Sequence, residues 1–180
     1  GIGVATLLPQ LSAYSDAGNR IAAVIGARSA SELLLVEEIQ KITHDLHLTT
    51  EEGDLVRKGS VTDALIELLE RGMKPSLILT AGSPLVMKST CEVAAHRGIP
   101  VFASLHPVMI DGMGMCGGCR VKVGGQVRFA CVDGPDFDAH QVDFDDLTVR
   151  LRRFAAEERA ALDRWSESCR LNGQAQSTEG

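Results

Sequence analysis

Short apolar runs and longer amphipathic segments alternate along the first 105 residues, and this alternation restricts the possible folds more than any other feature. The apolar runs suit strands that are buried on both faces of a parallel sheet. Strands that alternate with helices form βαβ units, so we predict an α/β domain with a doubly wound parallel sheet and ligands at the carboxyl ends of its strands. The predicted strands are 20–26, 45–50, 76–80 and 99–105, and the predicted helices are 4–18, 31–42, 60–72 and 83–98.

The chain opens with a glycine turn that leads straight into a helix, in the stretch GIGVATLLPQ from Gly1 to Gln10. This is the second half of a strand–glycine loop–helix unit, without the strand that should precede it. In a doubly wound sheet that first strand is usually flanked on both sides. We therefore expect an N-terminally truncated nucleotide-binding domain, as a fragment of a longer protein.

Composition and charge exclude several classes of protein. Hydrophobic residues make up 44% of the chain and charged residues 23%, which is typical of a globular domain. The formal net charge of −6 and the lack of a basic stripe argue against nucleic-acid binding. No apolar run is long enough to span a bilayer, and no secretory signal opens the chain. Five unevenly placed cysteines do not form a disulfide scaffold, so we expect a cytoplasmic protein.

Cysteines and glycines dominate the chain after Leu105. Four residues separate Asp111 from Cys116, two separate Cys116 from Cys119, and eleven separate Cys119 from Cys131. The plant-type [2Fe–2S] loop has the spacing C-x4-C-x2-C with a more distant fourth cysteine, and here aspartate takes the first position. The glycines let the loop wrap closely so that its N–H groups reach the sulfides. We therefore predict a [2Fe–2S] cluster on these three cysteines, with a hairpin around Gly124-Gly125 returning Cys131 to the loop.

The fourth ligand and the metal itself have alternatives. Asp111 is the first choice for the fourth ligand because of its register, and His106 and Asp133 are chemically possible. A structural zinc is the other metal that three cysteines suggest, although zinc ribbons usually offer two paired knuckles and Cys131 stands alone. Reduced thiols without a metal would be an oxidation liability.

The chain therefore divides into three predicted parts. Residues 1–105 form the nucleotide-binding α/β domain, and residues 106–144 form a small [2Fe–2S] module of loop and hairpin. Residues 145–180 form a charged helix to about residue 170 and a disordered tail. Isolated Cys91 is expected to be a small core residue of a helix, and Cys169 a free surface thiol.

Five stretches together resemble a known family. They are GIGVATLLP, GAR, KGSVTDAL, AGSPLVMK and DGMGMCGGCRV…FACVDGPDFD. The chain resembles the FAD/NAD-binding electron-transfer subunits of the ferredoxin–NADP reductase superfamily over residues 1–147. It is most similar to the small (alpha) subunit of NADH-dependent reduced ferredoxin:NADP oxidoreductase, also described as the sulfide dehydrogenase beta subunit. The electron-transfer subunit of dihydroorotate dehydrogenase B is the next relative.

The resemblance implies nucleotide contacts at the first two loops. Gly1 and Gly3 match the glycine turn where a pyrophosphate approaches a helix N-terminus, although they also suit a simple turn. Gly26, Ala27 and Arg28 follow the second strand of the family, where the adenosine ribose is met. Arg28 would pair with phosphate there, or else be a solvated surface charge.

The resemblance also implies roles for a third loop and for the cluster ligands. The turn formed by Ala81, Gly82, Ser83 and Pro84 matches the CGP-x-P-M turn near the nicotinamide. Its usual cysteine is Ala81 here, which excludes a thiol role. The cluster of the bifurcating branch has three cysteines and one aspartate, whereas the dihydroorotate branch has four cysteines, so Asp111 indicates the former.

The implied function is electron transfer by a flavin and iron–sulfur oxidoreductase. NAD(H) or NADP(H) would pass hydride to FAD on an upstream barrel domain, and the flavin would exchange single electrons with the [2Fe–2S] cluster. No side chain of this chain is assigned a catalytic role, and the fragment alone is expected to be inactive. The implied partners are a large glutamate-synthase-like flavoprotein and, through the complex, ferredoxin. The alternatives are a dihydroorotate dehydrogenase B subunit and a non-catalytic zinc-binding interaction module.

Overall fold

The computed structural model describes residues 1–53 and 56–176, with side chains up to residue 167. Its strands are β1 (Ala22–Ala27), β2 (Asp45–Thr50), β3 (Arg57–Lys58), β4 (Ile78–Thr80), β5 (Val101–Ser104), β6 (Arg120–Val123), β7 (Gln126–Phe129) and β8 (Asp136–Asp138). Its helices are α1 (Gly3–Asp16), α2 (Val36–Ile42), α3 (Val61–Glu70), α4 (Pro84–Ala95), α5 (Ala130–Asp133), α6 (Phe144–Leu151) and α7 (Ala155–Gln176), with 3₁₀ turns at Ala30–Glu32, Ala139–Gln141 and Arg152–Phe154.

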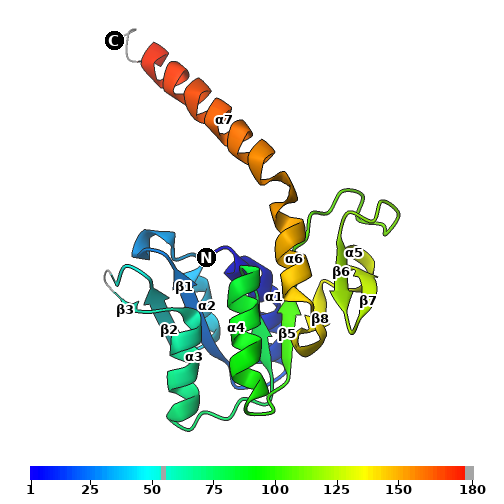
Figure 1. The fold of residues 1–180 in the computed structure, drawn as a ribbon. Helices are drawn as coiled ribbons and strands as arrows, with labels where there is room; N and C mark the ends of the chain where they lie inside the picture. The colour runs from blue at the N-terminus through cyan, green and yellow to red at the C-terminus, as the bar shows by residue number, and fades with distance from the viewer. Residues whose placement is uncertain (54–55, 177–180) are drawn as a thin grey trace.

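The strands form two three-stranded sheets and one hairpin (Figure 1). The first sheet is parallel in the order β1-β2-β3. In the second, β4 and β5 are parallel and β8 joins β5 in antiparallel register. The predicted α/β class with parallel strands is therefore confirmed, but the predicted single sheet is divided. Among the described residues no ladder links β1 to β4, so each of these strands has one edge without a strand partner.

Helices pack on both faces of the first sheet because parallel strands present apolar side chains on both faces. On one face, Ala23 and Ile25 of β1 are buried against Val4 of α1 and Ile39 of α2. Alternation along the strand turns Gly26 to the other face, where an added Cβ would lie 2.4 Å from Val61 Cγ2 of α3. A glycine at position 26 therefore lets α3 approach the strand closely.

Most of the predicted helices and strands are present with shifted ends. The predicted capping box of α3 is confirmed, with the Ser60 hydroxyl accepting the Asp63 N–H and the Asp63 carboxylate accepting the Ser60 N–H. The predicted helix 31–42 is shorter in the structure. A 3₁₀ turn comes first, and the left-handed backbone conformation of Leu35 (φ 56°) interrupts the helix before Val36. Leu33 and Leu35 pack against the core beside α1, which accounts for the interruption.

The cysteine-rich segment rejoins the α/β fold after its hairpin. β6 and β7 pair in antiparallel register around Gly124-Gly125, as predicted, and both glycines have positive φ. Residues 136–138 fall in the predicted cysteine module, 106–144, but form β8 in the sheet of β4 and β5. Buried residues of α4, β5, the hairpin and α6 belong to one core cluster, so the cysteine loop is anchored on the larger domain.

The C-terminal segment differs from its prediction. The expected single helix divides into α6, a 3₁₀ turn and α7, and α7 continues to Gln176, six residues into the segment predicted to be disordered. Residues 177–180 of that segment lie outside the described residues. α7 extends away from the α/β body (Figure 1). Its side chains Leu162 and Trp165 are exposed, as is Phe154 in the 3₁₀ turn that precedes it. Within the described part of the chain, no helix is long and apolar enough to cross a membrane.

Candidate metal centre and nucleotide site

The start of α1 lies against the loops that follow β1 and β4. The Gly1 amino group donates a hydrogen bond to the Gly26 carbonyl at the end of β1. A Cβ on Gly3 would lie 2.6 Å from the Ala81 carbonyl oxygen and 2.8 Å from the Gly82 nitrogen. Only glycine permits this approach at position 3 without moving backbone atoms. The structure thus brings five of the predicted nucleotide-binding positions together at the carboxyl ends of two strands.

The loop after β4 is shaped for a helix N-terminus. Gly82 has φ 144°, a conformation that side chains other than glycine rarely adopt. The Ser83 hydroxyl then caps α4 by accepting the Val86 N–H at 3.3 Å, and Pro84 occupies the first turn. The arrangement presents a helix N-terminus beside the start of α1, and a helix N-terminus favours anions.

Arg28 lies beyond the end of β1 in an acidic surrounding. Its guanidinium donates to Glu32 at 2.8 Å, and both side chains are exposed. The hydrogen bond and charge of Glu32 raise the pKa of Arg28, with smaller contributions from Glu52 and Glu51. Arg28 is therefore already paired with a carboxylate at the position where the sequence suggested a phosphate contact.

The cysteine loop connects β5 to β6 and meets the end of the hairpin. Cys119 is buried, and its Sγ lies 3.3 Å from Cys131 Sγ. The backbone N–H of Ala130 donates to the Cys119 carbonyl at 3.1 Å, which fixes this approach. The contact with Cys119 raises the pKa of the Cys131 thiol, desolvation adds to the rise, and the Gly114 N–H acts in the opposite direction.

Asp111 organises the first half of the same loop. Its Oδ1 accepts the Met113 N–H at 3.0 Å, and its Oδ2 accepts the Cys116 N–H at 2.7 Å. These backbone hydrogen bonds hold the pKa of the Asp111 carboxyl below its usual range, and the Cys116 side chain contributes in the same direction. Asp111 and the exposed Cys116 therefore form a second pair beside the pair of Cys119 and Cys131.

The four predicted cluster ligands are thus arranged as two pairs and do not form a single preformed metal site. In the described residues, no group of three or more His, Cys, Asp or Glu side chains is arranged around a point that could hold one metal ion. A tetrahedral zinc site needs such a group. The charge of Asp111 also influences the Cys131 thiol, which indicates that the two pairs are near each other.

The two alternative ligands lie in different settings. The Asp133 carboxylate accepts the Phe129 N–H at 2.7 Å and so closes the turn at the start of α5. His106 is exposed at the beginning of the cysteine loop. Asp111 remains the predicted fourth ligand because it contacts Cys116 directly.

Sequence reasoning missed Arg150 of α6, which reaches the cysteine loop. One guanidinium nitrogen, Nη2, donates to the Gly118 carbonyl at 3.3 Å. Gly118 lies between Cys116 and Cys119, so this contact joins α6 to the cysteine motif. No local signal marks Arg150, since it stands 31 residues after Cys119 in a charged helix.

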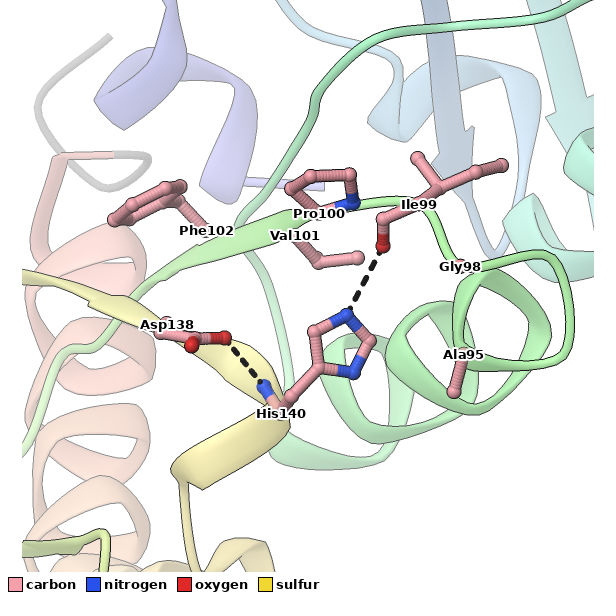
Figure 2. A pocket seen from close by; sticks show the side chains of 8 residues that line it. All are labelled: Ala95, Gly98, Ile99, Pro100, Val101, Phe102, Asp138 and His140. Atoms are coloured by element: carbon pink, nitrogen blue, oxygen red, sulfur yellow. Dashed lines mark hydrogen bonds between the residues drawn. The ribbon is translucent and has the colours of Figure 1, made fainter.

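His140 lines an open pocket at the opposite end of β5, and its ring contacts a cysteine outside the cysteine loop (Figure 2 shows the pocket). The His140 Nε2 lies 3.0 Å from the Ile99 carbonyl, which only accepts, so this nitrogen is the donor. Nδ1 then accepts the Cys91 thiol proton at 3.3 Å. Burial raises the pKa of Cys91, which fits the predicted role of a core residue. This pocket lies at the amino end of β5, away from the cysteine loop.

Comparison with known proteins gives a family match for the cysteine segment. Residues 106–143 match the iron–sulfur cluster binding domain of dihydroorotate dehydrogenase B. The chain is 42% identical over 165 residues to the dihydroorotate dehydrogenase B (NAD(+)), electron transfer subunit homolog of Thermotoga maritima. It is 34% identical over 144 residues to a probable dihydroorotate dehydrogenase B (NAD(+)), electron transfer subunit of Methanocaldococcus jannaschii. These alignments cover 92% and 80% of this chain, but only 58% and 54% of the relatives.

A solved structure is similar over the same extent. It is the NADH-dependent reduced ferredoxin–NADP oxidoreductase structure that gave insights into flavin-based electron bifurcation. The TM-score is 0.82 at 42% identity, over 92% of this chain and 59% of that chain. The chain thus spans little more than half the length of the proteins it matches. The matches confirm the resemblance to electron-transfer subunits and the prediction of an iron–sulfur-binding segment.

Proposed function

We propose that the chain, like the electron-transfer subunits to which it is similar, relays electrons between a nicotinamide nucleotide, FAD and a [2Fe–2S] cluster. The observation that supports this most strongly is the 3.3 Å approach of Cys119 Sγ and Cys131 Sγ. It occurs inside the segment that matches an iron–sulfur binding domain. Beside it stands the pair of Asp111 and Cys116.

Two ligand pairs fit the chemistry of a two-iron cluster. A [2Fe–2S] cluster has two protein ligands on each iron, and when bound it accepts and passes single electrons. We assign Asp111 and Cys116 to one iron and Cys119 and Cys131 to the other. The N–H of Gly118, which donates to Cys116 Sγ at 3.4 Å, is of the kind that stabilises cluster thiolates.

The nucleotide is proposed to bind at the carboxyl ends of β1 and β4. The pyrophosphate would lie at the start of α1 beside Gly1, where Gly3 lets the loop after β4 approach. Gly26 and Arg28 lie at the end of β1, where the adenosine ribose would lie. Ala81, Gly82, Ser83 and Pro84 form the turn expected to face the nicotinamide. FAD is proposed to lie mainly on a domain upstream of this chain.

The division of the sheet supports a further strand in the complete protein. Gly1 contacts the end of β1, and Gly3 contacts the residue after β4. The start of α1 therefore lies at the carboxyl ends of both strands, and we propose that a strand leading into α1 would lie between them. We expect the full-length protein to unfold more cooperatively and with a higher Tm than the 180-residue chain, as measured by circular dichroism.

The proposed partner is a large flavoprotein subunit of glutamate-synthase type, in a complex that couples NADH, NADPH and ferredoxin. The relatives are named as electron-transfer subunits, which implies that they work with another chain. Aspartate at position 111 favours this complex over a dihydroorotate dehydrogenase B complex. The family match of residues 106–143 supports the latter as the second candidate.

The first experiment is anaerobic purification of the full-length protein, followed by metal and sulfide analysis and EPR. Two irons with matching sulfide and a rhombic signal after reduction are expected for a [2Fe–2S] cluster. One zinc without visible absorption would contradict the proposal and support a zinc-binding interaction module. Copurification of a dihydroorotate-oxidising subunit would assign the chain to the second candidate.

A further inference from the structure

Arg150 places a half-buried positive charge beside the cysteine motif. Its Nη2 donates to the Gly118 carbonyl at 3.3 Å, and Gly118 lies within the Cys116-Gly-Gly-Cys119 knuckle. Its Nε is buried and has no hydrogen-bond partner in the structure. An arginine has five N–H donors, so most of its hydrogen-bonding capacity is not used by the described residues.

The neighbouring carboxylates of α6 and its cap are paired with other cations. Asp146 lies 3.0 Å from Lys122, and Asp143 lies 4.0 Å from the same Nζ. Asp145 pairs with Lys88 at 2.8 Å. Within the described part of the chain, no ion pair involves Arg150. A partly desolvated cation without a counter-charge is unfavourable, so an anion is the expected complement at this place.

A cluster on the adjacent cysteines is such an anion. With three thiolate ligands and one carboxylate, an oxidised [2Fe–2S] centre is negatively charged, and one-electron reduction adds a further negative charge. We propose that Arg150 is the cationic counter-charge of the cluster and raises its reduction potential; this inference rests on the proposed function. A positive charge stabilises the reduced form more than the oxidised form because the reduced form is more negative.

Two substitutions test whether the charge of Arg150 acts on the cluster. R150Q keeps a polar side chain with an N–H donor, although a shorter one, and removes the charge. R150K keeps the charge but loses the planar guanidinium. R153Q is the matched control, because Arg153 is an exposed arginine three residues further along the chain. All three are made in the full-length protein, and the midpoint is measured by redox titration followed by EPR.

We expect R150Q to disfavour cluster reduction about tenfold, which is about 59 mV lower for a one-electron couple. R150K and R153Q are expected to remain near the wild-type midpoint. If R150Q loses iron while R150K retains it at the wild-type midpoint, the result also supports the proposal, because the positive charge alone then distinguishes the protein that binds the cluster. An unchanged midpoint in R150Q, or loss of iron from R150Q and R150K alike, would overturn the proposal. The wild-type iron and sulfide content tests the proposed function separately.

Discussion

The carboxylate of Asp111 accepts the backbone N–H of Cys116 at 2.7 Å and so spans the first half of the cysteine loop. Its other oxygen accepts the Met113 N–H at 3.0 Å. An aspartate is therefore suited to this position even before any metal is considered, because its short side chain reaches the backbone of its own turn. The same carboxylate would give one iron an oxygen ligand.

Replacing Asp111 is expected to change both the loop and the cluster. D111A removes the acceptor of two N–H groups, so the Met113 and Cys116 amides should exchange with solvent faster in the apo protein. D111C should lower the cluster midpoint, because a thiolate donates more electron density to iron than a carboxylate. D145A is the control, since Asp145 is an exposed carboxylate outside the loop. An unchanged midpoint in D111C would rule out Asp111 as a ligand.

The thiols of the loop should differ in their reaction with iodoacetamide. Only the thiolate reacts, and contact with Cys119 raises the pKa of Cys131. Exposed Cys116 should therefore be modified before Cys131 in the apo protein at pH 7, as followed by peptide mass spectrometry. C119A should accelerate modification of Cys131, because it removes that contact. Equal rates at Cys131 in the wild type and C119A would show that the contact does not control its reactivity.

Much of the fold follows from local sequence patterns. The capping box of α3 and the glycine hairpin follow from neighbouring residues, and both are present as predicted. The interruption before α2 does not, because Leu33 and Leu35 are held by tertiary packing against the core cluster of α1, β1 and α2. β8 is also determined by tertiary structure. Its three residues are too few to show a strand pattern in the sequence, and they form a strand because they pair with β5.

The candidate site also has parts that follow from local sequence and parts that depend on long-range contacts. Cysteine spacing predicts the loop because its ligands lie close in sequence. Arg150 contacts Gly118 from 32 residues away in the sequence, and a contact at that separation cannot be predicted from a local sequence pattern. The contact between Gly3 and Ala81 is likewise long-range and could not be predicted from the sequence, although the glycine itself indicated a tight turn.

The capping box of α3 should stabilise the protein in a pH-dependent way. S60A removes the hydroxyl that accepts the Asp63 N–H and should cost about 1 kcal/mol at pH 7, measured by urea denaturation. Hydrogen bonds from Ser60 lower the pKa of Asp63. The contribution of the Asp63 carboxylate to the free energy of unfolding is therefore fully present above the unfolded-state pKa of about 4. It is lost as the pH falls through the lower pKa of the folded state. The effect of S60A should shrink at the acid end, and S12A, at an exposed position of α1, should show no such dependence.

The acidic surroundings of Arg28 should favour NADH over NADPH. Glu32, Glu51 and Glu52 all interact with Arg28, and a 2′-phosphate near them would be repelled. E32Q should therefore increase NADPH affinity by about two- to fivefold, the range expected for one exposed charge. NADH affinity should change little, and E70Q is a control at the far end of α3. Titration of the full-length protein with both nucleotides checks this; equal changes for the two would contradict it.

Adding a methyl group at Gly3 should damage both the fold and the nucleotide site. The Cβ of G3A would lie 2.6 Å from the Ala81 carbonyl oxygen, and backbone atoms must move to relieve the clash. Overpacking of this kind costs about 1–3 kcal/mol, so the free energy of unfolding should fall by that amount. The displacement would separate α1 from the loop before Ser83, and nucleotide affinity should fall as well. S12A, an exposed change on the same helix, should leave both unchanged. A G3A protein with wild-type stability and wild-type affinity would show that the two loops are not held together by this contact.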